Sequence, residues 1–129
     1  MFEVMIKPLS VNKAYKGRRF VTDEHKSYKK AMPLLLPSEL QLPPDKLVLL
    51  FRFHFKRKAS DVDNCCKAAQ DIITAHYGVD DREIYLTMNE KIINYNEPEY
   101  LEFEFLEYHE GMFDKCRKAI IETDGVNDN

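Results

Sequence analysis

Two carboxylates and a lysine stand where a hydrophobic segment gives way to a helical pattern. Asp61 and Asp63 are followed by Lys67 within the stretch SDVDNCCKAAQD, and a second acidic pair, Asp80 and Asp81, comes after the helical pattern. Hard divalent cations such as Mg²⁺ prefer oxygen ligands, usually one or more carboxylates with water and substrate phosphate completing the shell. These residues therefore make a metal site one candidate for this chain.

The chemistry of such a site would suit phosphodiester hydrolysis. A hard cation can polarise the phosphodiester and lower the pKa of a water molecule enough to make it a nucleophile near neutral pH. Lys67 would add positive charge to the transition state or orient the attacking water. Each residue also has a structural alternative. The first acidic pair suits a helix start, the second suits a turn, and Lys67 suits an i,i+4 surface pair with Asp71.

Basic residues gather in the stretches NKAYKGRRF and FKRKASD, where they could hold a phosphate backbone. Up to residue 79 the chain has 14 Lys and Arg against 8 Asp and Glu, and from residue 80 onward it has 5 against 14. This asymmetry allows a basic face on a chain whose net charge is −3. Solvated surface charge is the alternative. The candidate DNA-binding residues are Lys13, Lys16, Arg18, Arg19, Lys56, Arg57 and Lys58.

The elements that would position these residues begin with a strand over 2–7, FEVMIK, in which apolar and polar residues alternate. Residues 9–21 indicate a loop or a short hairpin. A capped helix follows and is limited by Pro33. A turn-rich connector, 37–46, then leads to the clearest strand of the chain.

That strand is KLVLLFRFHFK, residues 46–56. Its alternate apolar residues share one face, while Arg52, His54 and Lys56 share the other, so its second half is predicted to be apolar inside and basic outside.

The first acidic pair opens the next element, a predicted helix of about 16 residues over 61–76 that ends at Gly78. A helix of that length is about 24 Å long. The two acidic pairs, at its opposite ends, can therefore meet within one subunit only if the chain folds back, or else across a dimer interface.

The remaining chain predicts two strands, EIYLTMNEKIINY and EYLEFEFLE, joined as a late hairpin near NEPE, then a short amphipathic helix, MFDKCRKAIIET, and a fraying end, DGVNDN. This order predicts an α+β fold: one small domain with a mixed or mostly antiparallel sheet and two to three helices. No apolar run approaches the roughly 20 residues of a membrane span, and the N-terminus lacks the pattern of a signal peptide. A cytoplasmic protein without a membrane partner is expected.

The stretch KRKASDVDNCCKAAQDIITAHYGVDDREI resembles the signature of the RusA family of Holliday junction resolvases. That signature is a basic stretch, then D-x-D-N, a lysine four positions after the second Asp, an Asp four further on, and a DD pair after the helix. PLSVNKAY is similar to the family's N-terminal motif of Pro, Ser, Asn and Tyr. The matching residues are Pro8, Ser10, Asn12, Tyr15, Asp61, Asp63, Asn64, Lys67, Ala68, Asp71, Asp80, Asp81 and Ile84.

The resemblance implies a homodimeric, metal-dependent endodeoxyribonuclease that acts in DNA recombination and repair. It would resolve four-way DNA junctions with Mg²⁺ or Mn²⁺ by paired symmetric nicks. Asp61, Asp63 and Asp81 would be the acidic metal ligands, Lys67 the essential basic residue, and Asp80 a neighbour of the cluster. The sites would lie near the dimer interface, for which the exposed edge of 47–56 and the N-terminal strand are candidates.

The resemblance also implies a domain division and leaves rival functions open. Residues 1–107 would be the RusA-like nuclease domain, and residues 108–129 an acidic C-terminal helix with a frayed tail. One rival is a non-catalytic dimer that binds branched DNA. The other is a metal-dependent nuclease for forks, flaps or plain single strands.

Overall fold

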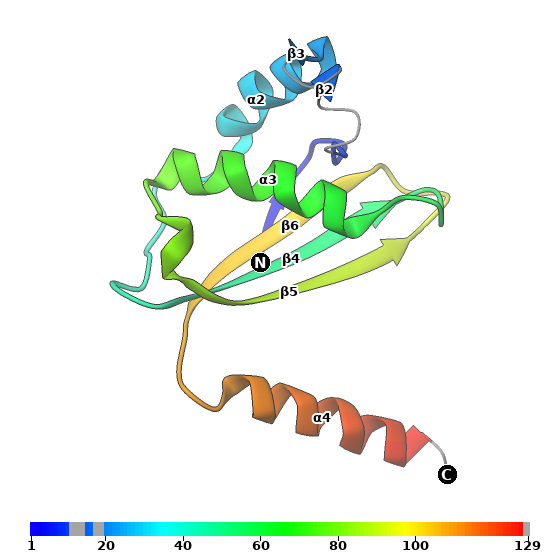
Figure 1. Ribbon diagram of the computed structural model, residues 1–129. Coiled ribbons are helices and arrows are strands. Elements are labelled where there is room, and N and C mark those ends of the chain that lie inside the picture. Colours follow the sequence, from blue (N-terminus) through cyan, green and yellow to red (C-terminus); the bar gives the residue numbers. More distant parts are fainter. Residues whose placement is uncertain (11–14, 17–19, 128–129) are drawn as a thin grey trace.

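The computed structural model describes residues 1–10, 15–16 and 20–127 (Figure 1). These residues form a small α+β domain with three helices and a four-stranded mixed sheet, in agreement with the predicted fold class. In chain order the elements are β1 (Phe2–Val4), β2 (Tyr15–Lys16), β3 (Phe20–Val21), α2 (Asp23–Leu35), β4 (Leu47–Phe55), α3 (Val62–Tyr77), the 3₁₀ turn η1 (Asp81–Glu83), β5 (Ile84–Ile93), β6 (Tyr100–Glu107) and α4 (Met112–Asn127).

The four-stranded sheet has the order β1-β6-β4-β5. β4 pairs in parallel with β5 and antiparallel with β6, while β1 pairs antiparallel with β6. The predicted late hairpin is therefore wrong, because β5 and β6 lie on opposite sides of β4. The segment between them crosses the end of β4, where the Asn94 amide donates to the Phe55 carbonyl at 2.9 Å. β4 is also a central strand, so the edge of 47–56 is not available as a dimer contact.

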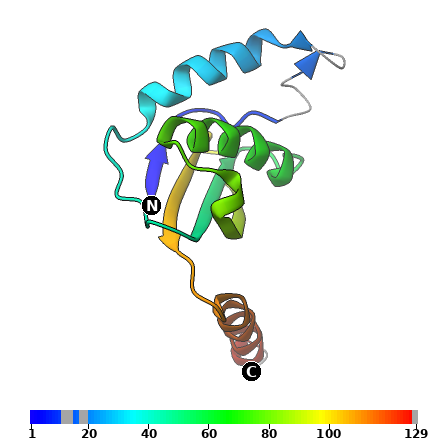
Figure 2. The same cartoon turned by 60° about the vertical axis from the view of Figure 1, so that its left-hand side comes forward.

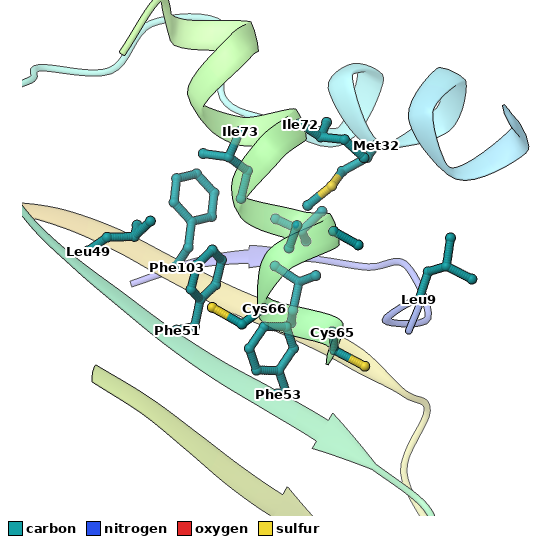
Figure 3. Packing of buried hydrophobic residues seen from close by; sticks show 14 of the residues in the cluster. Leu9, Met32, Leu49, Phe51, Phe53, Cys65, Cys66, Ile72, Ile73 and Phe103 are labelled. Carbon is teal, nitrogen blue, oxygen red and sulfur yellow. The ribbon is translucent and has the colours of Figure 1, made fainter. Parts of the chain in front are cut away.

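The core lies between the sheet and α3. Alternate residues of β4, from Leu47 to Phe55, are buried on the face that α3 covers. Figure 3 shows Phe51 and Phe53 of β4 and Phe103 of β6 directed towards α3. α2 then packs on α3 from outside through the buried side chains of Tyr28 and Met32. The order of layers is sheet, α3, α2 (Figures 1 and 2).

The ends of α3 follow the chemistry that the sequence predicts. The Asp61 side chain caps the N-terminus by accepting from the Asp63 amide at 3.0 Å. At the C-terminus Gly78 has φ +67°, the left-handed conformation that glycine adopts without steric cost. The chain then turns back at once towards β5. This tight reversal is what brings the segment after α3 back towards the sheet.

The sheet face opposite α3 carries no helix in the described part of the chain (Figures 1 and 2), and we call it the open sheet face. Arg52 and His54 of β4 lie on this face, as predicted, but the neighbouring strands supply carboxylates that were not predicted. Arg52 bonds to Glu90 at 3.1 Å and to Glu102 at 3.3 Å, and His54 bonds to Glu102 at 2.6 Å. Pairing of strands that lie far apart in sequence therefore neutralises this patch.

α4 extends beyond the sheet. Figure 1 shows it joined to β6 through residues 108–111 and standing apart from the other elements. It continues to Asn127, past Thr123, so the predicted fraying from Asp124 onward is wrong as far as residue 127. One glycine inside a helix costs only about 1 kcal/mol, which the remaining turns tolerate. No helix in the described ranges is long and apolar enough to cross a membrane.

Candidate active site

An open groove with a volume of about 290 Å³ lies between α3, β5 and the start of η1. One side of α3 supplies several of its residues, since positions spaced by three, four, seven and eight share a helix face. β5 contributes Asn89, whose register partner on β4 is Phe51, so both face α3. The groove is lined by Asp63, Cys66, Lys67, Gln70, Asp71, Asp81 and Asn89.

The groove brings together three predicted site residues from within one chain. Asp63 and Lys67 lie on the first turns of α3, and Asp81 opens η1 after the chain has turned back at Gly78. The return of the chain towards β5 therefore lets residues from both acidic pairs line one surface without a second subunit. Asp61 and Asp80, also predicted as site residues, do not line the groove.

Asp61 has a defined role at the start of α3. Its Oδ1 accepts from the Asp63 amide at 3.0 Å and its Oδ2 accepts from the Asn64 side chain at 3.1 Å. Oδ1 therefore caps the helix, and Oδ2 is engaged by a neighbouring side chain. This is the structural alternative that the sequence offered for one member of the first pair.

Asp80 is likewise engaged locally, at the start of η1. Its carboxylate accepts from the Arg82 amide at 2.9 Å and from the Arg82 guanidinium at 2.8 Å. The side-chain hydrogen bonds from Arg82 hold the pKa of the Asp80 carboxyl below its ordinary value. Asp80 thereby fixes the turn that presents Asp81 to the groove.

Lys67 is an exposed side chain on the wall of the groove. It forms no ion pair with any residue in the described ranges, so the surface pair with Asp71 that the sequence allowed does not form. An ammonium group without a carboxylate partner is available to an anionic ligand. Lys67 could therefore contribute its charge to a phosphate in the groove.

Four residues of the groove were not predicted as site residues: Cys66, Gln70, Asp71 and Asn89. The Cys66 thiol donates to the Asn89 side-chain oxygen at 3.5 Å and joins α3 to β5 at the floor of the groove. Burial raises the pKa of the Cys66 thiol. Asn89 could not be found from local spacing, because its position depends on the pairing of β5 with β4. Asp71 could have been found, since it follows Asp63 by eight residues on one helix face.

The donor chemistry of the groove fits a hard cation. Asp63, Asp71 and Asp81 offer carboxylate oxygens, which Mg²⁺ and Mn²⁺ prefer. Among the residues that the structure describes, no three Asp, Glu, His or Cys side chains lie close enough to hold one metal ion. Mg²⁺ usually takes only one or two carboxylates and completes its shell with water and substrate phosphates. The groove therefore offers carboxylate ligands for a partly hydrated ion rather than a complete set of protein ligands.

Three basic residues come shortly before the N-cap of α3 in the chain. Lys56, Arg57 and Lys58 are exposed in the segment between β4 and α3. Of the other predicted DNA-binding residues, Lys13, Arg18 and Arg19 lie outside the described residues, and for Lys16 only its backbone place in β2 is described. The basic segment from Lys56 to Lys58 thus places positive charge beside the first turn of α3.

Comparison with known proteins does not assign a function to this chain, so the chemistry of the groove is the basis for an assignment. No protein-family model matches the chain, and no curated protein matches it. The features that bear on function are Asp63, Lys67 and Asp81 in one groove, the basic segment that precedes α3, and the sequence motif to which the three residues belong.

Proposed function

We propose that this chain is a RusA-like, Mg²⁺- or Mn²⁺-dependent endonuclease that resolves four-way DNA junctions in recombination and repair. The observation that carries the proposal is the convergence of Asp63, Lys67 and Asp81 on one open groove. These residues belong to separate parts of the D-x-D-N…K…D-D motif, and no requirement of the core explains their meeting. An exposed groove lined by carboxylates and an unpaired ammonium suits a phosphodiester held together with a hard cation.

The residues of the groove would have different roles in hydrolysis. Asp63 and Asp81 would hold the cation, and Asp71, which lines the same groove, would support its water shell. When bound, Mg²⁺ or Mn²⁺ supplies positive charge at the phosphate and favours ionisation of a nearby water. The Lys67 ammonium would stabilise negative charge as it develops on the phosphate oxygens. The family resemblance adds Asp61 as a ligand next to Asp63.

Resolution of a junction requires two nicks in symmetry-related strands. A single groove makes one nick and leaves the junction intact. An isologous C₂ dimer presents two identical grooves in the symmetric relation that paired nicks need. A homodimer is therefore part of the proposal, and Lys56, Arg57 and Lys58 beside each groove would hold the DNA backbone.

The test is cleavage of a labelled four-way junction with and without Mg²⁺. We expect the wild type to release paired nicked products only with the metal. Asp63→Asn and Lys67→Ala should bind the junction with little change and lose cleavage by about 10²-fold or more, because each removes a charge that acts at the reacting phosphate. Gel-shift titration measures binding, and product formation under single-turnover conditions measures cleavage.

The matched control is Asp114→Asn, which removes one carboxylate from the exposed surface of α4 and should cleave as the wild type does. Normal cleavage by Asp63→Asn in Mg²⁺ would contradict the proposal. Binding by the wild type without cleavage would favour the non-catalytic branched-DNA-binding dimer. Equal cleavage of forks, flaps or single strands in the same substrate panel would favour the broader nuclease.

A further inference from the structure

α4 is a helix without a packing surface in the described part of the chain. Figures 1 and 2 both show it apart from the sheet and from α2 and α3. Its side chains at Phe113, Ile120 and Ile121 are 63%, 58% and 50% exposed. An isolated helix of this length is only marginally stable in water, and an apolar helix face is normally buried against another element. α4 therefore lacks the contact that its sequence is suited to make.

Five apolar residues of α4 fall on one side of the helix, whereas Ile121 lies outside this group. At 100° per residue, positions spaced by three, four and seven cluster together, and Lys115 and Arg117 flank the cluster on its two sides. Lys118 lies on the opposite side, where it pairs with Glu122 at 3.9 Å. We call the apolar cluster the α4 stripe, which consists of Met112, Phe113, Cys116, Ala119 and Ile120.

The open sheet face has a complementary character. Pairing in register places Leu50 of β4 beside Met88 of β5, and Val48 of β4 beside Leu86 and Leu106. Met88 and Leu106 are 43% and 38% exposed. The same face carries four carboxylates, at Glu3, Glu90, Glu102 and Glu104. They outnumber the two cations paired with them, because Arg52 pairs with Glu90 and Glu102 and the N-terminal amine pairs with Glu104 at 3.8 Å.

We propose that the α4 stripe of one copy packs on the open sheet face of a second copy, and that the exchange is reciprocal. The lengths agree, since 16 helical residues span about 24 Å and the eight residues of β6 span about 27 Å. The charges agree as well, because Lys115 and Arg117 beside the stripe would meet carboxylates such as Glu90 and Glu104. The second copy is the occupant because each chain carries both halves of the contact.

Reciprocity lets each chain contribute two surfaces to the contact. A specific interface typically buries about 800 Å² on each partner, and here every chain contributes one helix face and one sheet face. The inference names the contact of the homodimer in the proposed function. It is carried by surfaces that do not include the groove, so its failure and the failure of the nuclease assignment appear in different measurements.

The test is the molar mass of the full chain in solution, measured by light scattering and sedimentation. We expect the wild type at tens of micromolar to have twice the 15.2 kDa mass of one chain. Phe113→Glu with Ile120→Glu should raise the dissociation constant of the dimer by about 100-fold or more, because charge would enter an apolar contact. Circular dichroism and thermal melting should show the fold of the sheet domain retained, since neither side chain belongs to the core.

Two further variants make the outcome specific. Lys118→Glu changes the net charge by the same −2 as the double variant but lies opposite the stripe, so it should remain dimeric. Leu106→Glu alters only the sheet half of the contact and should also dissociate the dimer. A monomeric wild type would overturn the inference, and so would a dimer that survives Leu106→Glu. Metal-dependent nicking of the junction by the wild type in either of those cases would leave the nuclease chemistry of the groove standing, whereas a monomeric wild type would remove the homodimer from the proposed function.

Discussion

At the scale of single residues, neighbouring carboxylates do different work because of where the backbone places them. Asp61 stands at the N-cap of α3, with both oxygens accepting hydrogen bonds, whereas Asp63 is two residues further on and lines the groove. Asp80 and Asp81 repeat this division at η1, where the first fixes the turn and the second faces the groove. Each acidic pair thus joins a capping residue to a groove residue.

Substitution of Asp61 can separate its capping role from the ligand role that the resemblance implies. Asp61→Ser keeps a good N-cap and should cost no more than a few tenths of a kcal/mol, whereas Asp61→Ala should lower the free energy of unfolding by about 1 kcal/mol. We expect both variants to lose cleavage, because a hydroxyl caps a helix but supplies no anionic ligand. Denaturant unfolding measures the first effect and junction cleavage the second. Full cleavage by Asp61→Ser would restrict Asp61 to capping.

The buried thiol of Cys66 gives a pH dependence of known sign. Its pKa is raised above the ordinary value of 9.0, so between these two values the folded chain holds a proton that the unfolded chain has lost. The free energy of unfolding should therefore be unaffected by this group below pH 9 and should fall as the pH rises above it. Cys66→Ala should show a shallower fall in denaturant titrations from pH 8 to 10. An equal slope in both proteins would contradict the assignment.

The extent to which the candidate site could be predicted differs from residue to residue. Asp63 and Lys67 share a helix face by spacing alone, so their proximity followed from the sequence. The place of Asp81 depended on the direction in which the chain reverses after α3. Gly78 indicates that a reversal occurs there but not its direction. Asn89 could not be predicted as a groove residue, because only the parallel register of β5 against β4 sets its position. Cys66 was missed because its place in the helical pattern was that of a core residue.

At the scale of elements, the spacing of apolar residues predicted where helices and strands lie but not which strands pair with one another. The alternation in β4 and the bounds of α3 followed from apolar spacing, an N-cap and a terminal glycine. The pairing of β5 and β6 did not, since two consecutive strands form a hairpin or flank a third strand with the same local pattern. The carboxylates that neutralise Arg52 and His54 were missed for the same reason, because they come from strands about 40 to 50 residues away.

The end of α3 provides a test at this scale. Gly78 has φ +67°, and a Cβ added there would meet no atom within 4 Å, so the cost of a side chain is conformational rather than steric. Gly78→Ala should lower the free energy of unfolding by about 1 kcal/mol. Gly78→Asn should cost less, because asparagine tolerates the left-handed conformation better than alanine does. Chemical denaturation of the three proteins measures this order, and a stabilising alanine would contradict it.

At the scale of the whole molecule, charge is divided between surfaces. The basic segment from Lys56 to Lys58 lies beside the groove, while carboxylates from β1, β5 and β6 gather on the open sheet face. An acidic protein can therefore present a positive surface to DNA at one place and repel DNA at another. This arrangement would orient a junction towards the groove before any specific contact forms.

Salt dependence tests this orientation. Lys56→Ala with Lys58→Ala should weaken junction binding and reduce the slope of log K against log salt by up to about 2, since each lost phosphate contact releases one fewer counterion. The backbone contacts of both residues, to Glu99 and to Lys91, do not require the substituted side chains. Lys29→Ala with Lys30→Ala on the exposed side of α2 is the charge-matched control. Equal slopes for the two double variants would remove the basic segment from the DNA contact.

The pairing of β1 with β6 has a consequence for how the chain emerges from the ribosome. Phe2 of β1 has Phe103 of β6 as its register partner, about a hundred residues later in the chain, so β1 stays unpaired until β6 has been translated. β4 likewise stays unpaired until both of its neighbours, β5 and β6, have been translated. A nascent chain that stalls or is truncated before β6 therefore leaves strand edges free to pair with other molecules, the situation in which aggregation begins.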